Sequence, residues 1–229
     1  MIILSQTESL MSSEFGTALA GAFTGAAAAF LFQAAWEHKK QRDSEHSAII
    51  EAQMALIAQW NHLATIQKQY LEPYRSSSDR HVEMVHYSAT DPLQRINFGA
   101  IAFLLKEAEP NLILEMQLAE QSYRSAIDAI EQRNLTYLRF GERAKVANFH
   151  PDQISTGKVS LLSEHPLDLI MLKSQTDLIF EATERALVRI EKAFMKFLTE
   201  AQKRDYGKRL FKVEQFMPKE TAKPKYPVV

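Results

Sequence analysis

The sequence contains no cysteine among its 229 residues. This absence excludes disulfide scaffolds, cysteine-ligated zinc or iron–sulfur sites and thiol catalysis. Glycine and proline are also scarce, at seven and eight residues. Turn-rich β-sandwiches and dinucleotide-binding folds use more of both residue types. A fold built from helices is therefore favoured.

An excess of positive charge is missing as well. Lysine and arginine number 27 against 28 aspartates and glutamates, which gives a net charge of -1. Proteins dedicated to nucleic-acid binding usually carry a strong basic excess. We therefore expect no nucleic acid among the partners of this chain.

No recognisable catalytic motif occurs. The nucleophile elbow Gly-x-Ser-x-Gly, a glycine-rich phosphate loop and His-Glu-x-x-His are all absent. Glu83-x-x-His86 matches one element of a di-iron bundle, but such a centre needs two of these elements and two further glutamates. We expect no enzyme, no metal and no cofactor. A site assembled from scattered residues is the open alternative, with Glu83, His86, His165 and Asp168 as its candidates.

One long segment lacks charge altogether. Residues 15–36, FGTALAGAFTGAAAAFLFQAAW, contain no Asp, Glu, Lys or Arg. About 20 such residues in a helix span the hydrocarbon core of a bilayer. Trp36 stands at the end of the segment, where aromatic side chains anchor a span at the interface. The pattern predicts a transmembrane helix over residues 15–36.

Basic residues flank only one end of this segment. Lys39, Lys40 and Arg42 follow it, whereas residues 1–14 contain no lysine or arginine. The positive-inside rule then predicts a single-pass protein, typical of a bacterial inner membrane. Residues 1–14 would form a short extracytoplasmic N-terminus, and the remainder of the chain would lie in the cytoplasm.

Two other interpretations of the segment stay open. A cleaved secretory signal begins with a basic region, whereas the residues before this segment are acidic. A buried helix of a soluble protein is the second possibility, because the segment is rich in alanine and poor in leucine and isoleucine.

Small residues recur at every fourth position of the segment: Thr17, Gly21, Gly25 and Ala29. This spacing places them on one face of a helix, and Gly21-x-x-x-Gly25 is the pattern that lets two helices approach closely in lipid. We expect self-association into a homo-oligomer through this face. An alanine-rich helix also produces such spacing by chance.

The remainder of the chain has helical spacing of apolar residues. The first helix is expected over residues 47–71, with Pro73 ending it. Its apolar face is expected to contain Ile50, Met54, Ile57, Ala64 and Leu71, widened by Ile49, Leu56, Trp60 and Leu63. Residues 73–91 are expected to form a loop in which His81 and His86 are solvated. Asp91 and Pro92 are expected to cap a short helix over about 92–108.

Two longer helices are expected over residues 110–146 and from Pro166 to about 206, separated by a loop over 147–165 with a short strand or turn at 159–162. Both show apolar positions alternating by four and three, which is typical of helices packed side by side. In the first, these positions are Leu112, Met116, Ala119, Tyr123, Ala126 and Ile130. In the second, they are Ile179, Thr183, Ala186, Ile190, Ala193 and Phe197.

The predicted fold is therefore all-α. A transmembrane helix is followed by a cytoplasmic bundle of about four helices over residues 37–216, with long antiparallel coiled-coil-like pairs, and by a flexible tail over 217–229. Basic residues accumulate near the end of the last helix. Contact with anionic lipid is expected from Lys203, Arg204, Lys208, Arg209 and Lys212. A solvated helix face is the ordinary alternative.

The expected function is that of a membrane-anchored, non-enzymatic helical scaffold, adaptor or accessory subunit. It would self-associate through its transmembrane helix and bind a cytoplasmic protein partner, with membrane lipid as its other partner. The alternative is a membrane-active effector, in which the small-residue helices assemble into a pore gated by the cytoplasmic domain.

Overall fold

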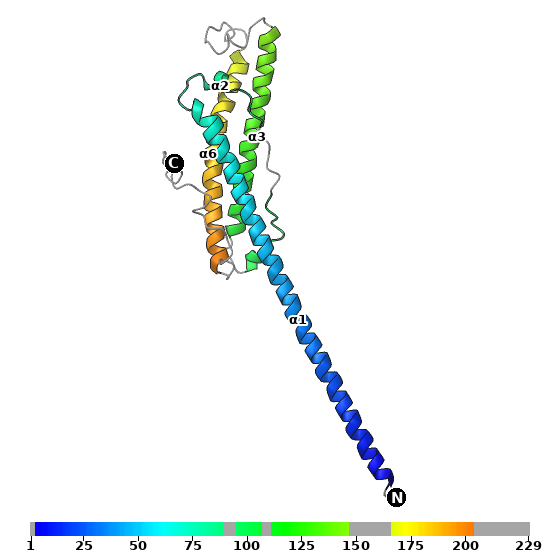
Figure 1. Ribbon diagram of the computed structural model, residues 1–229. Helices are drawn as coiled ribbons and strands as arrows, with labels where there is room; N and C mark the ends of the chain where they lie inside the picture. Colours follow the sequence, from blue (N-terminus) through cyan, green and yellow to red (C-terminus); the bar gives the residue numbers. More distant parts are fainter. Residues whose placement is uncertain (1–2, 89–94, 107–110, 147–165, 204–229) are drawn as a thin grey trace. The chain divides into compact units, whose positions relative to one another are not determined.

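The computed structural model describes residues 3–88, 95–106, 111–146 and 166–203 (Figure 1). These residues contain helices and turns but no β-strand. The elements in chain order are α1 (Ile3–Ile66), the π-helical turn η1 (Gln67–Leu71), the 3-10 helix η2 (Glu72–Tyr74), α2 (Arg80–Glu83), the 3-10 helix η3 (Ala102–Lys106), α3 (Asn111–Val146) and α6 (Pro166–Lys203). The predicted all-α fold is confirmed.

The chain divides into two compact units, Met1–Ser47 and Ala48–Val229. Within its described residues, the first unit consists of the N-terminal part of α1. The second unit contains the C-terminal part of α1 together with all later elements. The long helix is possible because no proline occurs before Pro73. After α1 the chain continues through η1 into η2, which contains Pro73, and the continuous helical segment ends there as predicted.

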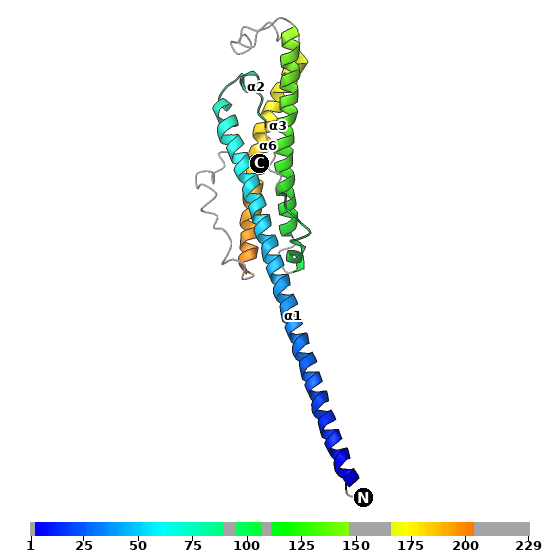
Figure 2. The same cartoon turned by 45° about the vertical axis from the view of Figure 1, so that its right-hand side comes forward.

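The second unit is a bundle whose core lies between three long helices: the part of α1 after Ser47, α3 and α6. In both views α3 and α6 lie side by side (Figures 1 and 2). Every predicted apolar position of the 110–146 and 166–206 helices is buried, from Leu112 to Ile130 on α3 and from Ile179 to Phe197 on α6. The four–three spacing therefore identified both core faces correctly.

The apolar face predicted for residues 47–71 is confirmed in part. Ile49, Leu56 and Leu63 are completely buried, whereas Met54 is 40% exposed and Ile50 is half-buried. The core face is centred on the residues that were predicted to widen the apolar face, and the alanines at 48, 52 and 55 are buried beside them.

The helix predicted over about 92–108 is not formed in its described part. Residues 95–101 are irregular or in turns, and only η3 is helical. The Asn97 side chain accepts a hydrogen bond from the Ala100 N–H at 3.1 Å, which offers the backbone an alternative to a helix, and Gly99 lowers helix propensity further. The burial of Ile96, Ile101 and Leu104 agrees with the prediction that the segment belongs to the core. Asp91 and Pro92 lie outside the described residues.

Candidate functional site

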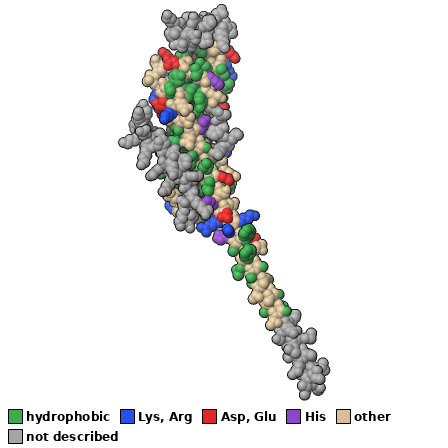
Figure 3. Space-filling model, in the orientation of Figure 1, with side chains coloured by type: hydrophobic (Ala, Val, Ile, Leu, Met, Phe, Trp, Pro, Cys, Tyr) green, Lys and Arg blue, Asp and Glu red, His purple; other side chains and the backbone are tan. Residues whose placement is uncertain are grey.

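By length and composition, one stretch of α1 is long and apolar enough to cross a membrane. None of the residues in its most apolar part is buried within the chain. Its large apolar side chains are 48–73% exposed: Leu19, Phe23, Phe30, Leu31, Phe32 and Trp36. Figure 3 shows hydrophobic side chains along the surface of this part of the helix. Exposed apolar surface of this extent marks a site that contacts lipid or another protein.

Polar side chains within this stretch find partners on their own helix. The Thr24 hydroxyl donates to the carbonyl oxygen of Ala20 at 2.8 Å and lies 3.1 Å from that of Gly21. The Gln33 amide donates to the Glu37 carboxylate at 3.0 Å. An unsatisfied polar group in hydrocarbon costs several kcal/mol, so this internal pairing makes the stretch compatible with a lipid environment.

The predicted self-association stripe of Thr17, Gly21, Gly25 and Ala29 lies on α1, and all four residues are exposed. A Cβ atom added to Gly21 or Gly25 would meet no atom within 4 Å in the described chain. Glycine inside a helix is less favourable than alanine by about 1 kcal/mol. No close approach within the described residues therefore explains these two glycines.

The basic residues of α6 are only partly available for lipid contact. Lys192 and Lys196 lie 3.7 and 3.1 Å from the Glu115 carboxylate of α3, and Arg189 donates to the Ser122 hydroxyl at 2.9 Å. Lys203, the last described residue of α6, bonds to Glu200 at 2.5 Å. The remaining lipid-contact candidates lie outside the described residues: Arg204, Lys208, Arg209 and Lys212.

Among the residues that the structure describes, the most enclosed cation is Arg133 on α3, whose side chain is completely buried. Its guanidinium donates to the Tyr70 hydroxyl and the Val85 carbonyl, both at 3.2 Å, to the His81 carbonyl at 3.1 Å and to the Met84 carbonyl. Among the described residues no carboxylate pairs with it. Burial lowers the pKa of Arg133 from its usual value. Carbonyl dipoles and a phenol thus take the place of a counter-ion.

Neighbouring polar contacts complete this cluster. The Asn134 amide donates to the Tyr87 carbonyl at 2.6 Å, and the Tyr87 N–H donates back to the Asn134 side-chain oxygen at 3.3 Å. The Tyr70 hydroxyl donates to the Val85 carbonyl at 2.6 Å, and burial raises the pKa of Tyr70 to about 12. Two consecutive residues of α3 therefore hold the segment that follows α2. This arrangement is structural, because every contact is made to backbone or to a phenol.

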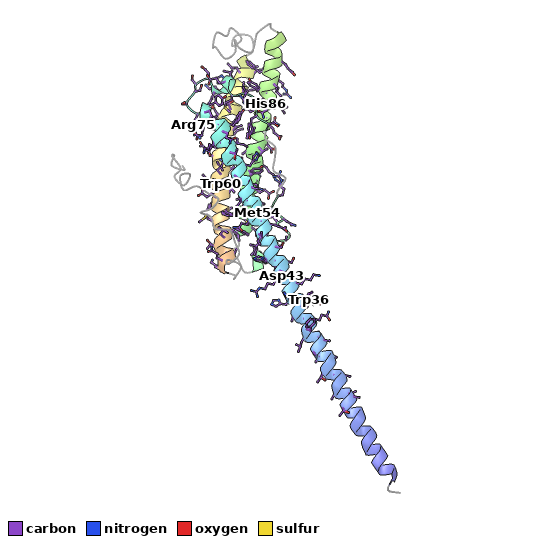
Figure 4. The ribbon with its side chains drawn as sticks, in the orientation of Figure 1. Trp36, Asp43, Met54, Trp60, Arg75 and His86 are labelled. Carbon is purple, nitrogen blue, oxygen red and sulfur yellow. The ribbon has the colours of Figure 1, made fainter. Side chains whose placement is uncertain are left out.

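The structure describes three of the four candidate residues for chemistry, Glu83, His86 and Asp168. Glu83 ends α2 and His86 lies in the following segment, both exposed (Figure 4). The prediction that His81 is solvated is wrong: it is 9% exposed, and burial lowers its pKa. Asp168 is half-buried in the first turn of α6, while His165 lies outside the described residues. Within the described ranges, no group of three or more His, Asp or Glu residues could hold a metal ion.

Comparison with known proteins finds no matching family model, no matching curated protein and no matching solved structure. The fold and the exposed stretch of α1 define an all-α protein with one candidate membrane helix.

Proposed function

We propose that this chain is a membrane-anchored, non-enzymatic scaffold, adaptor or accessory subunit that crosses the membrane once through residues 15–36. One observation carries the proposal: the apolar side chains of this part of α1 are exposed and no described residue covers them. Each large apolar side chain left in water forgoes about 1.5–3 kcal/mol of burial free energy. Lipid around the helix removes that surface from water.

The charges beside the span support an orientation. Lys39, Lys40 and Arg42 lie within six residues after Trp36 and are exposed on α1. Basic residues next to a span remain on the cytoplasmic side. The bundle from Ala48 onwards then lies in the cytoplasm, with the bacterial inner membrane as the compartment that fits this arrangement.

Self-association through the small-residue stripe is the second part of the proposal. Gly21 and Gly25 leave the helix backbone open to a neighbour, and nothing in the described chain uses that space. Backbones that approach closely gain van der Waals contact, which drives helix association in lipid. A second copy of the same helix provides the complementary surface.

Co-purification of two differently tagged full-length copies from membranes tests the association. Gly21→Leu combined with Gly25→Leu fills the stripe and should strongly reduce recovery of the second copy. Ala27→Leu combined with Ala34→Leu adds bulk on the opposite side of the helix and should leave recovery unchanged. Equal recovery with both variants would show that the stripe is not the contact.

Exposed leucines on α3 support binding of a protein partner by the bundle. Leu135 and Leu138 are nearly half exposed on the C-terminal half of this helix. A photo-reactive residue at position 138 should capture one discrete protein in cells, and Leu135→Ser should reduce that product. If neither happens, this surface does not bind a partner.

A pore formed by the span is the competing function. Its polar lining would need Gln33, whose amide instead bonds to Glu37 of the same helix. Expression of the chain should therefore not admit a membrane-impermeant dye to cells. Dye entry would favour the pore over the scaffold.

A further inference from the structure

The surface of α1 has a shallow hollow at the end of its apolar stretch. Phe32, Gln33 and Trp36 line the hollow, and all three side chains are exposed. Two of these three side chains are aromatic. Trp36 (Figure 4) is placed where an interfacial aromatic side chain of a membrane helix lies, between the acyl chains and the headgroups. The hollow therefore faces the upper part of the acyl chains when the helix spans a bilayer.

Two lysines follow the hollow on the same side of the helix. Because an α-helix turns by about 100° and rises by about 1.5 Å per residue, Lys39 and Lys40 are offset by about 60° and 40° from Trp36, one on either side of it, and lie about one turn beyond it. Both are exposed, and no carboxylate in the described part of the chain pairs with them. Figure 3 shows charged side chains directly beyond the apolar part of this helix. Two ammonium groups thus flank the hollow on its polar side.

The nearby acidic residues leave this charge in place. Glu37 is the one acidic residue between Trp36 and Asp43. Its carboxylate accepts a hydrogen bond from the Gln33 amide at 3.0 Å, and it is offset by about 100° from Trp36. Asp43 lies on the same side as Trp36, but it is about one turn farther from the apolar stretch than the lysines. The charge next to the hollow is therefore positive.

We propose that this site binds an anionic phospholipid, with an acyl chain against Phe32 and Trp36 and the phosphate group between Lys39 and Lys40. The proposal rests on the membrane span proposed above. A phospholipid has its apolar and anionic parts in the same order in which the helix presents its aromatic and cationic side chains. A free phosphate ion would leave the apolar hollow empty, and a zwitterionic headgroup would bring a second cation towards the lysines. The cytoplasmic leaflet, where these lysines lie in the proposed orientation, is the one that carries anionic lipid.

Arg42 separates a built site from a general attraction between basic residues and the membrane. The positive-inside rule depends on how many lysines and arginines flank a span and not on the side of the helix that they occupy. Arg42 is close to the span as well, but it is offset by about 120° from Trp36. A general attraction treats these three cations alike, whereas the proposed site depends on Lys39 and Lys40.

The site is compatible with the self-association proposed for the same helix. Ala29 precedes Trp36 by seven residues, so the small-residue stripe lies on about the same side as the hollow. Helices that pack through Gly-x-x-x-Gly cross at about 40° and diverge on both sides of the glycines. At Trp36, about 15–20 Å beyond the crossing, the two helix axes are about 10 Å or more farther apart than at the glycines. The hollow of each copy thus stays open to lipid.

Quenching of Trp36 fluorescence by brominated lipids tests the site, because bromine on an acyl chain quenches a tryptophan that the chain touches. The full-length protein is reconstituted in phosphatidylcholine vesicles that contain increasing fractions of brominated phosphatidylglycerol or, in a parallel series, of brominated phosphatidylcholine. Trp60 is buried in the bundle, and the Trp36→Phe chain measures its share of the signal for subtraction. Brominated phosphatidylglycerol should quench Trp36 at lower fractions than brominated phosphatidylcholine.

Single charge removals locate the headgroup. Lys39→Gln and Lys40→Gln should each lower the preference for phosphatidylglycerol about fivefold, since one basic residue close to anionic lipid contributes about that factor. Arg42→Gln is the matched control, because it removes one charge at a similar distance from the span. At about 150 mM salt, which screens charges that are not in contact, it should change the preference by less than about twofold. Quenching by brominated phosphatidylcholine should be the same in all these proteins.

Three results would overturn the proposal. Equal quenching of the wild type by the two lipids would show that the hollow has no preference for an anionic headgroup, while the span itself would stand. Equal loss of preference in all three charge variants would show a general attraction without a site. Absence of quenching by either lipid, with Trp36 open to acrylamide in the water, would show that this part of α1 is outside the bilayer, and the proposed span would then fall with the site.

Discussion

Arg133 donates a hydrogen bond to the hydroxyl of Tyr70 at 3.2 Å, across 63 residues of sequence. The same hydroxyl donates to the Val85 carbonyl at 2.6 Å, and Arg133 reaches that carbonyl directly at 3.2 Å. One buried cation therefore joins α3, the helical turn after α1 and the segment after α2. Hydrogen bonds as well as apolar burial therefore position this segment in the bundle.

Removal of the Arg133 guanidinium is expected to destabilise the bundle. In Arg133→Met the carbonyls of His81 and Met84 lose their donor while they stay away from water, and we expect a loss of about 2–4 kcal/mol in unfolding free energy. Urea unfolding of the detergent-solubilised full chain measures it through the fluorescence of the buried Trp60, with Trp36 replaced by phenylalanine.

Arg139→Met is the matched control, because Arg139 lies exposed on the same helix. It should change the unfolding free energy by no more than about 0.5 kcal/mol. Equal values for the two variants would contradict the role assigned to Arg133.

Tyr70 is expected to make stability fall at high pH. Burial raises the pKa of Tyr70 in the folded chain to about 12, above the usual value of about 10. Its contribution to the unfolding free energy is therefore complete below pH 10 and is lost as pH rises through 12. The unfolding free energy should fall by about 2–3 kcal/mol over this interval because of this group. Tyr70→Phe should remove that part of the fall. Parallel curves for the two proteins would contradict the prediction.

His81 is expected to make stability fall at acidic pH. Burial lowers its pKa in the fold despite the nearby carboxylates Asp79 and Asp177. Its contribution to the unfolding free energy is therefore present above about pH 6.5 and is lost as pH falls through the pKa of His81 in the folded chain. Urea midpoints measured between pH 7.5 and pH 5 should fall less in His81→Asn than in the wild type. His86→Asn, a change at an exposed residue, should keep the wild-type curve; if both variants behave alike, burial of His81 is not the cause.

The sequence predicted the core faces of α3 and α6 residue by residue, because regular spacing on a helix determines which side chains meet a neighbour. Arg133 shows where such prediction ends. It continues the α3 spacing, three residues after Ile130 and four before Tyr137, but a charged residue was not counted among the predicted core positions. Its acceptors are carbonyl groups of the segment that follows α2. Their positions depend on the path of that segment, which periodicity does not determine.

The burial of His81 and the irregular backbone at Asn97 were missed for a related reason. Both lie in connecting segments, where side-chain hydrogen bonds and local packing compete with helix formation. The exposed stretch of α1 was predicted well, since length and absence of charge are sufficient to recognise it. What contacts its small-residue stripe depends on molecules outside the chain.

Alkaline-carbonate extraction of the full-length protein from cell membranes tests the central claim most directly. An integral span over residues 15–36 predicts that the protein stays in the membrane pellet, together with a known integral protein and apart from peripheral ones. Release into the supernatant would show that this part of α1 is peripheral or covered by protein, and it would contradict the membrane anchor.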